Sequence, residues 1–421
     1  MTQTIELLPG VRFHCFPDHR FKQGSLSIQL VRPMCREEAA KNALLSAVLL
    51  RGCREYPDMR SVIRRLDDLY GASVSALVRR IGDYQTTGLY CAFIEDKYAL
   101  QGDAILAPMV ALLRQLLLEP VMEDGGFSRE FTESEKRNLI LTIEAERNDK
   151  RVYANTQLLR TMCSADSFGI PRLGTAEQAA AIDHKSLYDH YQRILRESAV
   201  EIFYVGSAEA QTVAELLKTL FDGVQRDYVN LPAQTSFRDG GGSHRTEEME
   251  VAQAKLCMGF TTPITNRCDE FAAMQVLNTV FGSGMTSKLF MNIREKMSLC
   301  YSIGSGYYGS KGIVTVSAGI DAAKEAVTRQ EILHQLELCR EGSISPEELK
   351  SAKEAILSSL RGVHDSPGAI ENFHGTAAIS GLLLTRESYM AAIEAVTAED
   401  AAAAARTLRL HSSYFLKGVT A

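Results

Sequence analysis

Residues 282–301 read GSGMTSKLFMNIREKMSLCY, and no other stretch constrains the fold of this chain as closely. The stretch opens on Gly282 and Gly284, continues as a helix-like run, and reaches Arg294 and Tyr301. A spacing of seven residues is close to two helical turns, so these last two side chains are predicted to project toward the same side. A guanidinium and a phenol hydroxyl are suitable donors for a peptide carbonyl oxygen. The stretch is therefore predicted to contact a peptide.

Composition describes a globular protein of more than one domain. The chain has 421 residues, of which 45% are apolar and 23% charged, so two or more cores are expected. The net charge of −6, with lysines and arginines dispersed, argues against nucleic acid as a partner. No stretch is apolar enough to span a membrane, and the first ten residues lack a signal-peptide pattern. The nine cysteines are scattered without Cys-x-x-Cys pairs, which fits a reducing cytoplasm.

The pattern of apolar residues repeats at an offset of about 230 residues. Each half is expected to contain a strand, a helix, a shorter helix with a strand pair, and two long helices. The expected ranges are 25–31, 37–51, 64–96, 99–119 and 127–148 in the first half, and 254–260, 269–281, 288–321, 322–341 and 346–362 in the second. Strands in runs followed by helices predict an α+β fold, in which each half is a mainly antiparallel sheet with helices packed on one face.

A polar segment separates the two halves. Residues 227–250 include the glycine triplet at 240–242, which is typical of a flexible linker. A phosphate-binding loop is the alternative, but no Lys-Ser/Thr follows the triplet and no apolar strand precedes it. The predicted domains are therefore 1–226 and 251–421, joined by 227–250.

The 282–301 stretch resembles the second-half signature of the insulinase/pitrilysin-type zinc metallopeptidases, and the resemblance covers nearly the whole chain. In that family a first-half helix carries His-x-x-Glu-His just before a Lys/Arg-Gly pair. Aligning that pair on Arg51-Gly52 puts Ala43, Ser46 and Ala47 at the positions of the two histidines and the glutamate. None of these side chains can coordinate zinc or act as its general base.

The family takes a third zinc ligand, a glutamate, from a later helix. The alignment puts Ile143 at that position and Glu144 one residue beyond it. One residue turns a helix by about 100°, so Glu144 is not expected to replace the ligand. The nine histidines form no alternative motif, since no two are three or four residues apart. The chain is therefore expected to hold no metal and no cofactor, with zinc only in a partner subunit.

The resemblance implies a non-catalytic subunit. Such a subunit would pair with a zinc-bearing homologue as a heterodimer, form half of a clamshell chamber, bind an unfolded peptide along a sheet edge, and lend Arg294 and Tyr301 to the partner's site. Gly282 and Gly284 belong to the same predicted substrate-binding segment. The 148–154 segment resembles a stretch found in bacterial non-catalytic relatives.

Three alternatives remain open from the sequence. Arg294 and Tyr301 also fit an ordinary exposed helix end followed by a strand. The whole chain could be a homodimeric peptide-binding or scaffolding protein with no proteolytic role. It could also be a peptidase whose metal site has moved elsewhere.

Overall fold

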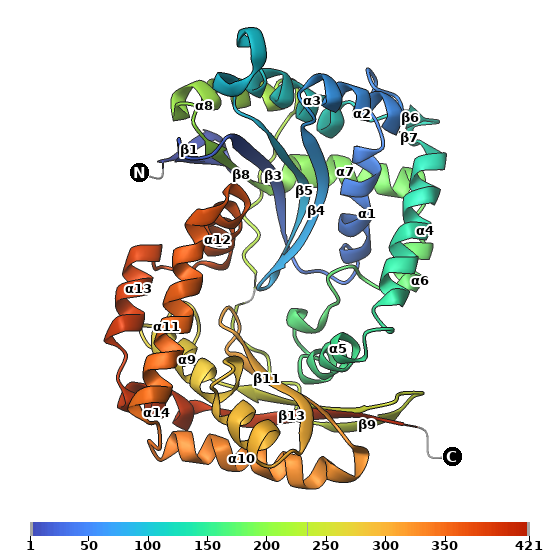
Figure 1. The fold of residues 1–421 in the computed structure, drawn as a ribbon. Helices are drawn as coiled ribbons and strands as arrows, with labels where there is room; N and C mark the ends of the chain where they lie inside the picture. The colour runs from blue at the N-terminus through green and yellow to red at the C-terminus, as the bar shows by residue number, and fades with distance from the viewer. Residues whose placement is uncertain (1–2, 234, 419–421) are drawn as a thin grey trace. The chain divides into compact units, whose positions relative to one another are not determined.

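The computed structural model describes residues 3–233 and 235–418, and two compact units share this chain (Figure 1). Unit 1 comprises Met1–Glu144, Pro171–Ala233 and Val363–Ile379, and unit 2 comprises Ala145–Ile170, Gln234–Gly362 and Ser380–Ala421. Each unit is built on one large sheet. The units therefore do not coincide with the predicted halves, because each half contributes one segment to the other unit.

Unit 1 contains a six-stranded sheet in the order β1-β2-β8-β3-β5-β4. The strands are β1 (Gln3–Leu8), β2 (Val11–Pro17), β3 (Gln23–Pro33), β4 (Ser73–Ile81), β5 (Tyr84–Ile94) and β8 (Ala199–Gly206). All neighbours are antiparallel except β2 and β8, which run parallel. The sheet is therefore mixed rather than purely antiparallel.

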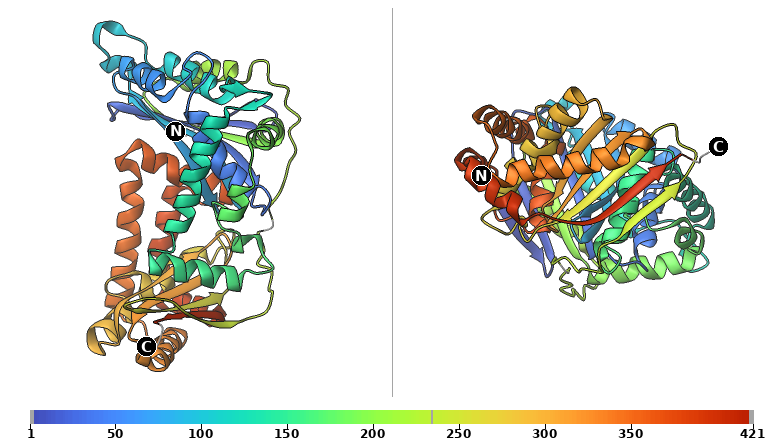
Figure 2. Two further views of the ribbon diagram at one scale, coloured as in Figure 1. Left: turned by 90° about the vertical axis from the view of Figure 1, so that its right-hand side faces the viewer. Right: turned by 90° about the horizontal axis from the view of Figure 1, so that it is seen from below.

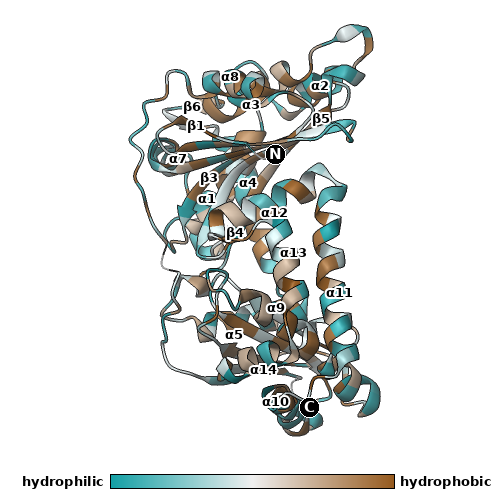
Figure 3. Cartoon of the chain, turned by 90° about the vertical axis from the view of Figure 1, so that its left-hand side faces the viewer, coloured by the Kyte–Doolittle hydropathy of each residue, from teal (hydrophilic) through white to brown (hydrophobic). Residues whose placement is uncertain are grey.

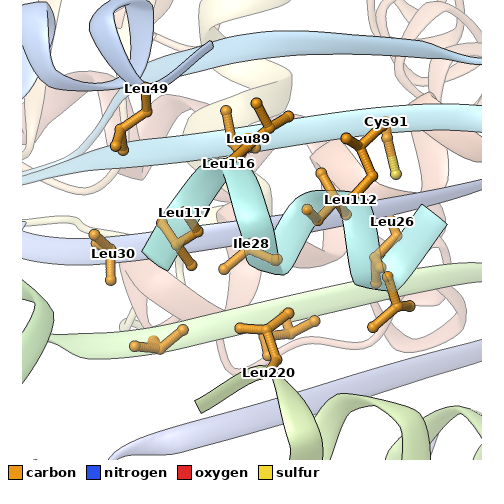
Figure 4. Close-up of a cluster of buried hydrophobic side chains, with 14 of the residues drawn as sticks. Leu26, Ile28, Leu30, Leu49, Leu89, Cys91, Leu112, Leu116, Leu117 and Leu220 are labelled. Atoms are coloured by element: carbon orange, nitrogen blue, oxygen red, sulfur yellow. The ribbon is translucent and has the colours of Figure 1, made fainter. Parts of the chain in front are cut away.

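The main core of unit 1 lies between this sheet and a layer of helices. Apolar residues of β3, among them Leu26 and Ile28, pack with Leu112 and Leu116 of α3 (Figure 4). The helices of the unit are α1 (Ala39–Leu50), α2 (Met59–Asp68), α3 (Leu106–Leu118), α4 (Arg129–Ala145), α6 (Ala176–Ala180), α7 (His184–Glu197), α8 (Ala210–Lys218) and α12 (Pro367–Ser380). Short elements are the hairpin β6 (Met122–Glu123) and β7 (Gly126–Phe127), and the 3-10 turns η1 (Asp96–Tyr98), η2 (Leu100–Gly102), η4 (Thr219–Phe221) and η8 (Val363–Asp365).

The opposite face of the first sheet is covered by α12. Alternation along β3 sends Ser27 and Gln29 to this face, and both side chains are buried. The buried carboxylate of Glu371 on α12 accepts hydrogen bonds from both of them, at 2.8 Å and 2.7 Å. Polar positions that would suit a solvated sheet face are thus enclosed, because a helix from the second half of the chain brings their hydrogen-bond partner.

Unit 2 contains a five-stranded sheet in the order β11-β12-β10-β13-β9. The strands are β9 (His244–Glu248), β10 (Ala254–Thr261), β11 (Cys300–Tyr308), β12 (Ile313–Ile320) and β13 (Arg409–Lys417). Neighbours are antiparallel except β13 and β9. The order matches β4-β5-β3-β8-β2 of unit 1, strand for strand and with the same parallel pair.

This match corrects the prediction that residues 227–250 form only a flexible linker. Strand β9 lies inside that range and pairs with β13, for example His244 with Ser413. Its composition is polar because β9 is an edge strand with mostly exposed side chains. The second sheet therefore begins at His244, before the predicted domain boundary at 251.

Helices cover both faces of the second sheet, which corrects the prediction of helices on one face. The helices are α5 (Lys150–Met162), α9 (Phe271–Asn278), α10 (Glu325–Arg340), α11 (Pro346–Gly362), α13 (Arg386–Ala395) and α14 (Ala398–Thr407), with 3-10 turns η3 (Ser167–Gly169) and η7 (Ala322–Lys324). Helix α5 lies on one side of the strands and α10 on the other (Figures 1 and 2). A Cβ at Gly259 of β10 would lie 2.6 Å from the sulfur of Met162, so glycine permits the close approach of α5.

Two π-helices, η5 (Thr279–Ser283) and η6 (Leu289–Lys296), connect α9 to β11. Figure 3 shows apolar and polar segments alternating along α11, whose buried residues are Ala352, Leu357 and Leu360. Within the described ranges, no helix is both long and apolar enough to cross a bilayer.

Candidate functional site

The expected zinc positions on α1 belong to the packed interior of unit 1. Ala43 is 6% exposed and forms part of the main core. Ser46 is fully buried, and its hydroxyl lies 3.1 Å from the hydroxyl of Thr87 and 3.4 Å from the carbonyl oxygen of Leu77. Ala47 is half-buried. Ala43 and Ala47 fill space, and the Ser46 hydroxyl is hydrogen-bonded to Thr87 of β5. None of the three side chains can bind a metal.

The third expected position lies on α4. Ile143 is half-buried and packs against the main core, whereas the neighbouring Glu144 is exposed. The helix thus directs the apolar side chain inward and the carboxylate outward, as the rotation of about 100° per residue requires.

A hydrogen-bonded network beside Ala43 was not anticipated from the sequence. The side chain of Asn42 donates to Oε1 of Gln85 at 2.9 Å, and its Oδ1 lies 2.7 Å from Nε2 of His190. Because Arg193 can only donate to the other ring nitrogen, at 3.1 Å, His190 is neutral with its proton on Nε2. Burial lowers the pKa of His190 to about 4, which agrees with this assignment. The feature of the sequence that points to this network is Asn42, an amide side chain in a mostly apolar helix.

These residues do not fit a zinc ion. Both ring nitrogens of His190 are engaged by protein, and the aligned positions carry methyl, hydroxyl and sec-butyl groups. Over residues 3–233 and 235–418, no cluster of three His, Cys, Asp or Glu side chains could hold a metal. No chemical step is therefore assigned to a metal at the positions aligned with the zinc motif.

The second candidate segment, in unit 2, is exposed. Arg294 lies on η6 with its guanidinium 4.6 Å from the ring centroid of Phe290 and 3.6 Å from the carboxylate of Glu295. Tyr301 is 63% exposed, and its hydroxyl donates to Asp321 at 3.3 Å. The helix ends at Lys296 and Tyr301 belongs to β11. The prediction that Arg294 and Tyr301 lie two turns apart on one helix is therefore wrong.

Helix η6, which carries Arg294, packs against β11. Burial raises the pKa of the Cys300 thiol to about 11, and the positive charges of Arg294 and Lys324 act on this thiol in the opposite direction. Cys300 is the residue directly before Tyr301. Between η6 and β11 the chain turns through Ser298, whose φ of 50° is left-handed.

One face of η6 is buried and hydrogen-bonded within unit 2. Leu289 and Ile293 are fully buried. The buried ammonium of Lys288 lies 2.9 Å and 3.0 Å from the two carboxylate oxygens of Glu348 on α11, and Asn292 donates to Gln335 of α10 at 2.9 Å. Arg294 thus projects from the exposed side of η6, whose opposite side is fixed by these contacts to α10 and α11.

The two glycines of the segment differ in their surroundings. A Cβ at Gly282 would lie 2.7 Å from Leu289 and from the Ser305 hydroxyl, so only glycine lets η5 pack this closely on β11. A Cβ at Gly284 would meet its nearest atom at 3.4 Å, which is ordinary contact. The close packing of η5 therefore requires glycine at position 282, whereas the contacts around Gly284 do not.

Large apolar side chains are exposed in the stretch of sequence that carries Arg294. Met285 is 78% exposed, Met291 47% and Met297 42%, and Tyr301 lies in the same stretch of sequence. We call these four residues the methionine patch. Methionine is flexible and polarizable, and it is common at surfaces that accept varied partners.

Comparison with known proteins shows similarity to inactive relatives of metallopeptidases. Residues 181–356 match the family model described as "Peptidase M16 inactive domain". The chain is 29% identical over 409 residues to a protein of Bacillus subtilis named "Probable inactive metalloprotease YmfF", which covers 97% of this chain and 96% of that protein. A crystal structure of a conserved protein from Enterococcus faecalis superposes with a TM-score of 0.93 at 29% identity, covering 100% of this chain and 99% of the other.

A second crystal structure, of a peptidase M16 inactive domain from Pseudomonas fluorescens, shares the fold with a TM-score of 0.81 at 15% identity, over 100% of this chain and 98% of the other. The chain is thus similar, over part of its length in the family model and over nearly all of it in the Bacillus subtilis protein, to inactive members of the peptidase M16 group. The family resemblance read from the 282–301 stretch is confirmed.

Proposed function

We propose that this chain is a non-catalytic subunit of an M16 peptidase. It pairs with a zinc-bearing homologue, contributes part of a peptide-binding chamber, and presents Arg294 and Tyr301 to the peptide that the partner cleaves. The observation that carries this proposal is the contrast between its two signature regions. The zinc positions are closed by packing, as at Ala43, whereas Arg294 and Tyr301 are exposed.

The donors of both side chains are available to a substrate. The ion pair between Arg294 and Glu295 is exposed on both sides and long, and such pairs contribute at most about 1 kcal/mol. The bond from Tyr301 to Asp321 is also long, at 3.3 Å. Both groups can therefore be redirected at little cost to a carbonyl oxygen that becomes negatively charged during hydrolysis.

The methionine patch supports a partner that covers this region. Covering apolar side chains contributes about 25 cal/mol per Å² of buried area. The similarity to a Bacillus subtilis protein named "Probable inactive metalloprotease YmfF" is consistent with a subunit that lacks its own catalytic metal. All nine cysteines are free thiols, which is consistent with a reducing cytoplasm.

The proposal is tested in two steps. First, affinity purification of the tagged chain from its native cell is expected to recover a homologue with an intact His-x-x-Glu-His motif. Second, in the reconstituted complex, Arg294→Ala is expected to lower the peptidase rate about 10²–10³-fold, as for loss of an oxyanion donor. Arg361→Ala is the matched control, since Arg361 is an exposed arginine at the end of α11.

Other outcomes would favour the homodimeric scaffolding alternative. Recovery of only a second copy of this chain would contradict the pairing. A complex whose peptidase rate is equal with Arg294 and with alanine would contradict the catalytic role of Arg294. Stoichiometric zinc in the purified chain alone would contradict the non-catalytic assignment.

A further inference from the structure

We infer that unit 2 carries a subsite for an acidic side chain of an extended peptide, formed by Arg151 and strand β11. This inference rests on the proposed function, because it names where and how the chain would hold the peptide. It concerns a cavity distinct from the Arg294 and Tyr301 pair.

The cavity lies between the first turns of α5 and the strands β11 and β12. Its volume is about 390 Å³, which suits one or two side chains rather than a large ligand. Its wall on the helix side is made by Arg151, Val152, Asn155 and Thr156. All of its lining residues belong to unit 2.

The floor of the cavity is a sheet surface with little side-chain volume. Register pairs Gly304 with Ser317 and Gly306 with Thr315, so these four residues share one face of the sheet. A Cβ at Gly306 would meet only the Thr315 hydroxyl, at 3.7 Å, within 4 Å. Glycine inside a strand often marks the close approach of a ligand or another backbone.

Strand β11 is the edge of its sheet, with β12 as its sole neighbour in the order of the described strands. An edge strand presents unpaired N–H and C=O groups that accept another extended chain. In a strand added there, alternate side chains point to the same face as Gly304 and Gly306 and therefore into the cavity.

The charge around the cavity selects the kind of side chain. Arg151 is exposed, and no described carboxylate forms an ion pair with it, while none of the described lining residues is acidic. The nearby carboxylate of Asp149 is used to cap α5, where it accepts the N–H groups of Arg151 and Val152 at 3.0 Å and 3.1 Å. Lys255, which the register places on the same sheet face as Ser302, does not line the cavity, and its ammonium donates to Gln253, so Arg151 is the cation of the lining.

Hydroxyl groups complete the complementarity. The lining includes Thr156, Ser302, Thr315 and Ser317, whose hydroxyls can donate to a carboxylate. An arginine can bind a carboxylate with two parallel hydrogen bonds, which is stronger than a neutral contact. Glutamate or aspartate is therefore the side chain that the cavity fits.

The test uses two fluorescein-labelled peptides of alternating threonine and valine, with either glutamate or glutamine at one central position. Fluorescence anisotropy with the full chain is expected to show tighter binding of the glutamate peptide. Arg151→Gln is expected to weaken that peptide about tenfold and to leave the glutamine peptide unchanged, as for one lost charge-assisted hydrogen bond. Added salt is expected to reduce the preference for glutamate.

Arg160→Gln is the matched control. Arg160 is an exposed arginine on the same helix, and nine residues turn a helix to roughly its opposite side. Gly306→Val provides a second variant, because its Cβ has room beside Thr315, its methyl groups would occupy cavity space, and valine favours strands. It is expected to weaken both peptides.

Equal binding of the two peptides to the unchanged chain, or equal effects of Arg151→Gln and Arg160→Gln, would overturn the inference. Those results would leave the proposed function intact if Arg294→Ala still slowed the reconstituted peptidase. Failure of the Arg294 test, with a retained glutamate preference that depends on Arg151, would overturn the proposed function alone.

Discussion

The carboxylate of Glu371 lies 2.9 Å from the guanidinium of Arg79, although the two residues are 292 positions apart in the sequence. Glu371 is fully buried on α12, and Arg79 lies on the edge strand β4. The same carboxylate also accepts from Ser27 and Gln29. One buried group thus connects a helix of the second half to three side chains of the first sheet.

Removal of Glu371 is expected to destabilise unit 1. Glu371→Ala leaves Arg79 without its ion-pair partner and removes the carboxylate that accepts from Ser27 and Gln29, and breaking a buried pair costs about 3–5 kcal/mol. Hydrogen exchange of the β3 and α12 amides is expected to accelerate, and the urea midpoint to fall. Glu354→Gln, which affects only an exposed pair with Lys350, is the control and should change stability by less than about 1 kcal/mol. Unchanged exchange in α12 would contradict this role.

Restoring a carboxylate at Ser46, the position aligned with the general-base glutamate, is expected to damage the fold rather than rebuild a site. Ser46→Glu places a longer, ionisable side chain against Thr87 in a fully buried position, so both overpacking and desolvation oppose it. Ser46→Ala removes one buried hydrogen bond and should cost only about 1 kcal/mol. Thermal unfolding of the two variants measures the difference. A Ser46→Glu chain as stable as Ser46→Ala would show that this position is open.

Stability is expected to depend on pH through His190. Its pKa is about 4 in the folded chain against 6.5 for an unperturbed histidine, so between these values the unfolded chain binds more protons. Stability should therefore be fully present above about pH 6.5 and decline as the pH falls toward about 4, by up to about 3 kcal/mol. His190→Gln should flatten this part of the profile.

Denaturant unfolding across this pH range measures the effect. His19→Gln is the control, because His19 is exposed on the same unit. A profile that keeps its slope after His190→Gln would assign the pH dependence to other groups.

The methionine patch is expected to affect assembly and not folding. Combined serine substitutions at Met285, Met291 and Met297 remove exposed apolar groups, so the stability of the isolated chain should change by no more than about 0.5 kcal/mol for each. Pairing with the zinc-bearing homologue should weaken measurably in analytical ultracentrifugation. The control is a variant in which three exposed polar residues of α11 are replaced by serine. Unaltered pairing would place the interface elsewhere.

Local sequence patterns predicted most of the secondary structure correctly. The expected strand at 254–260 is β10, and the expected helix at 346–362 is α11. The expected helix at 99–119 begins later, at Leu106, because Gln101 adopts a left-handed conformation and the Asp96 side chain accepts the N–H groups of Ile105 and Leu106. Such loop interactions leave no periodic pattern.

The sequence by itself determined the resemblance to M16 peptidases, the lack of zinc ligands at Ala43, Ala47 and Ile143 and of the general base at Ser46, and the segment that carries Arg294 and Tyr301, because these depend on residue identity at fixed spacings. Only the tertiary structure decided which helix covers which sheet. In the sequence, Ser27 and Gln29 suggest a solvated sheet face, but in the structure they are buried and donate to Glu371 of α12. Likewise, nothing in the sequence around Gly259 explains a glycine there, whereas the structure shows that α5 packs closely on it. These contacts join residues far apart in the chain, and hydrophobic periodicity reports only that a face is buried, not what buries it.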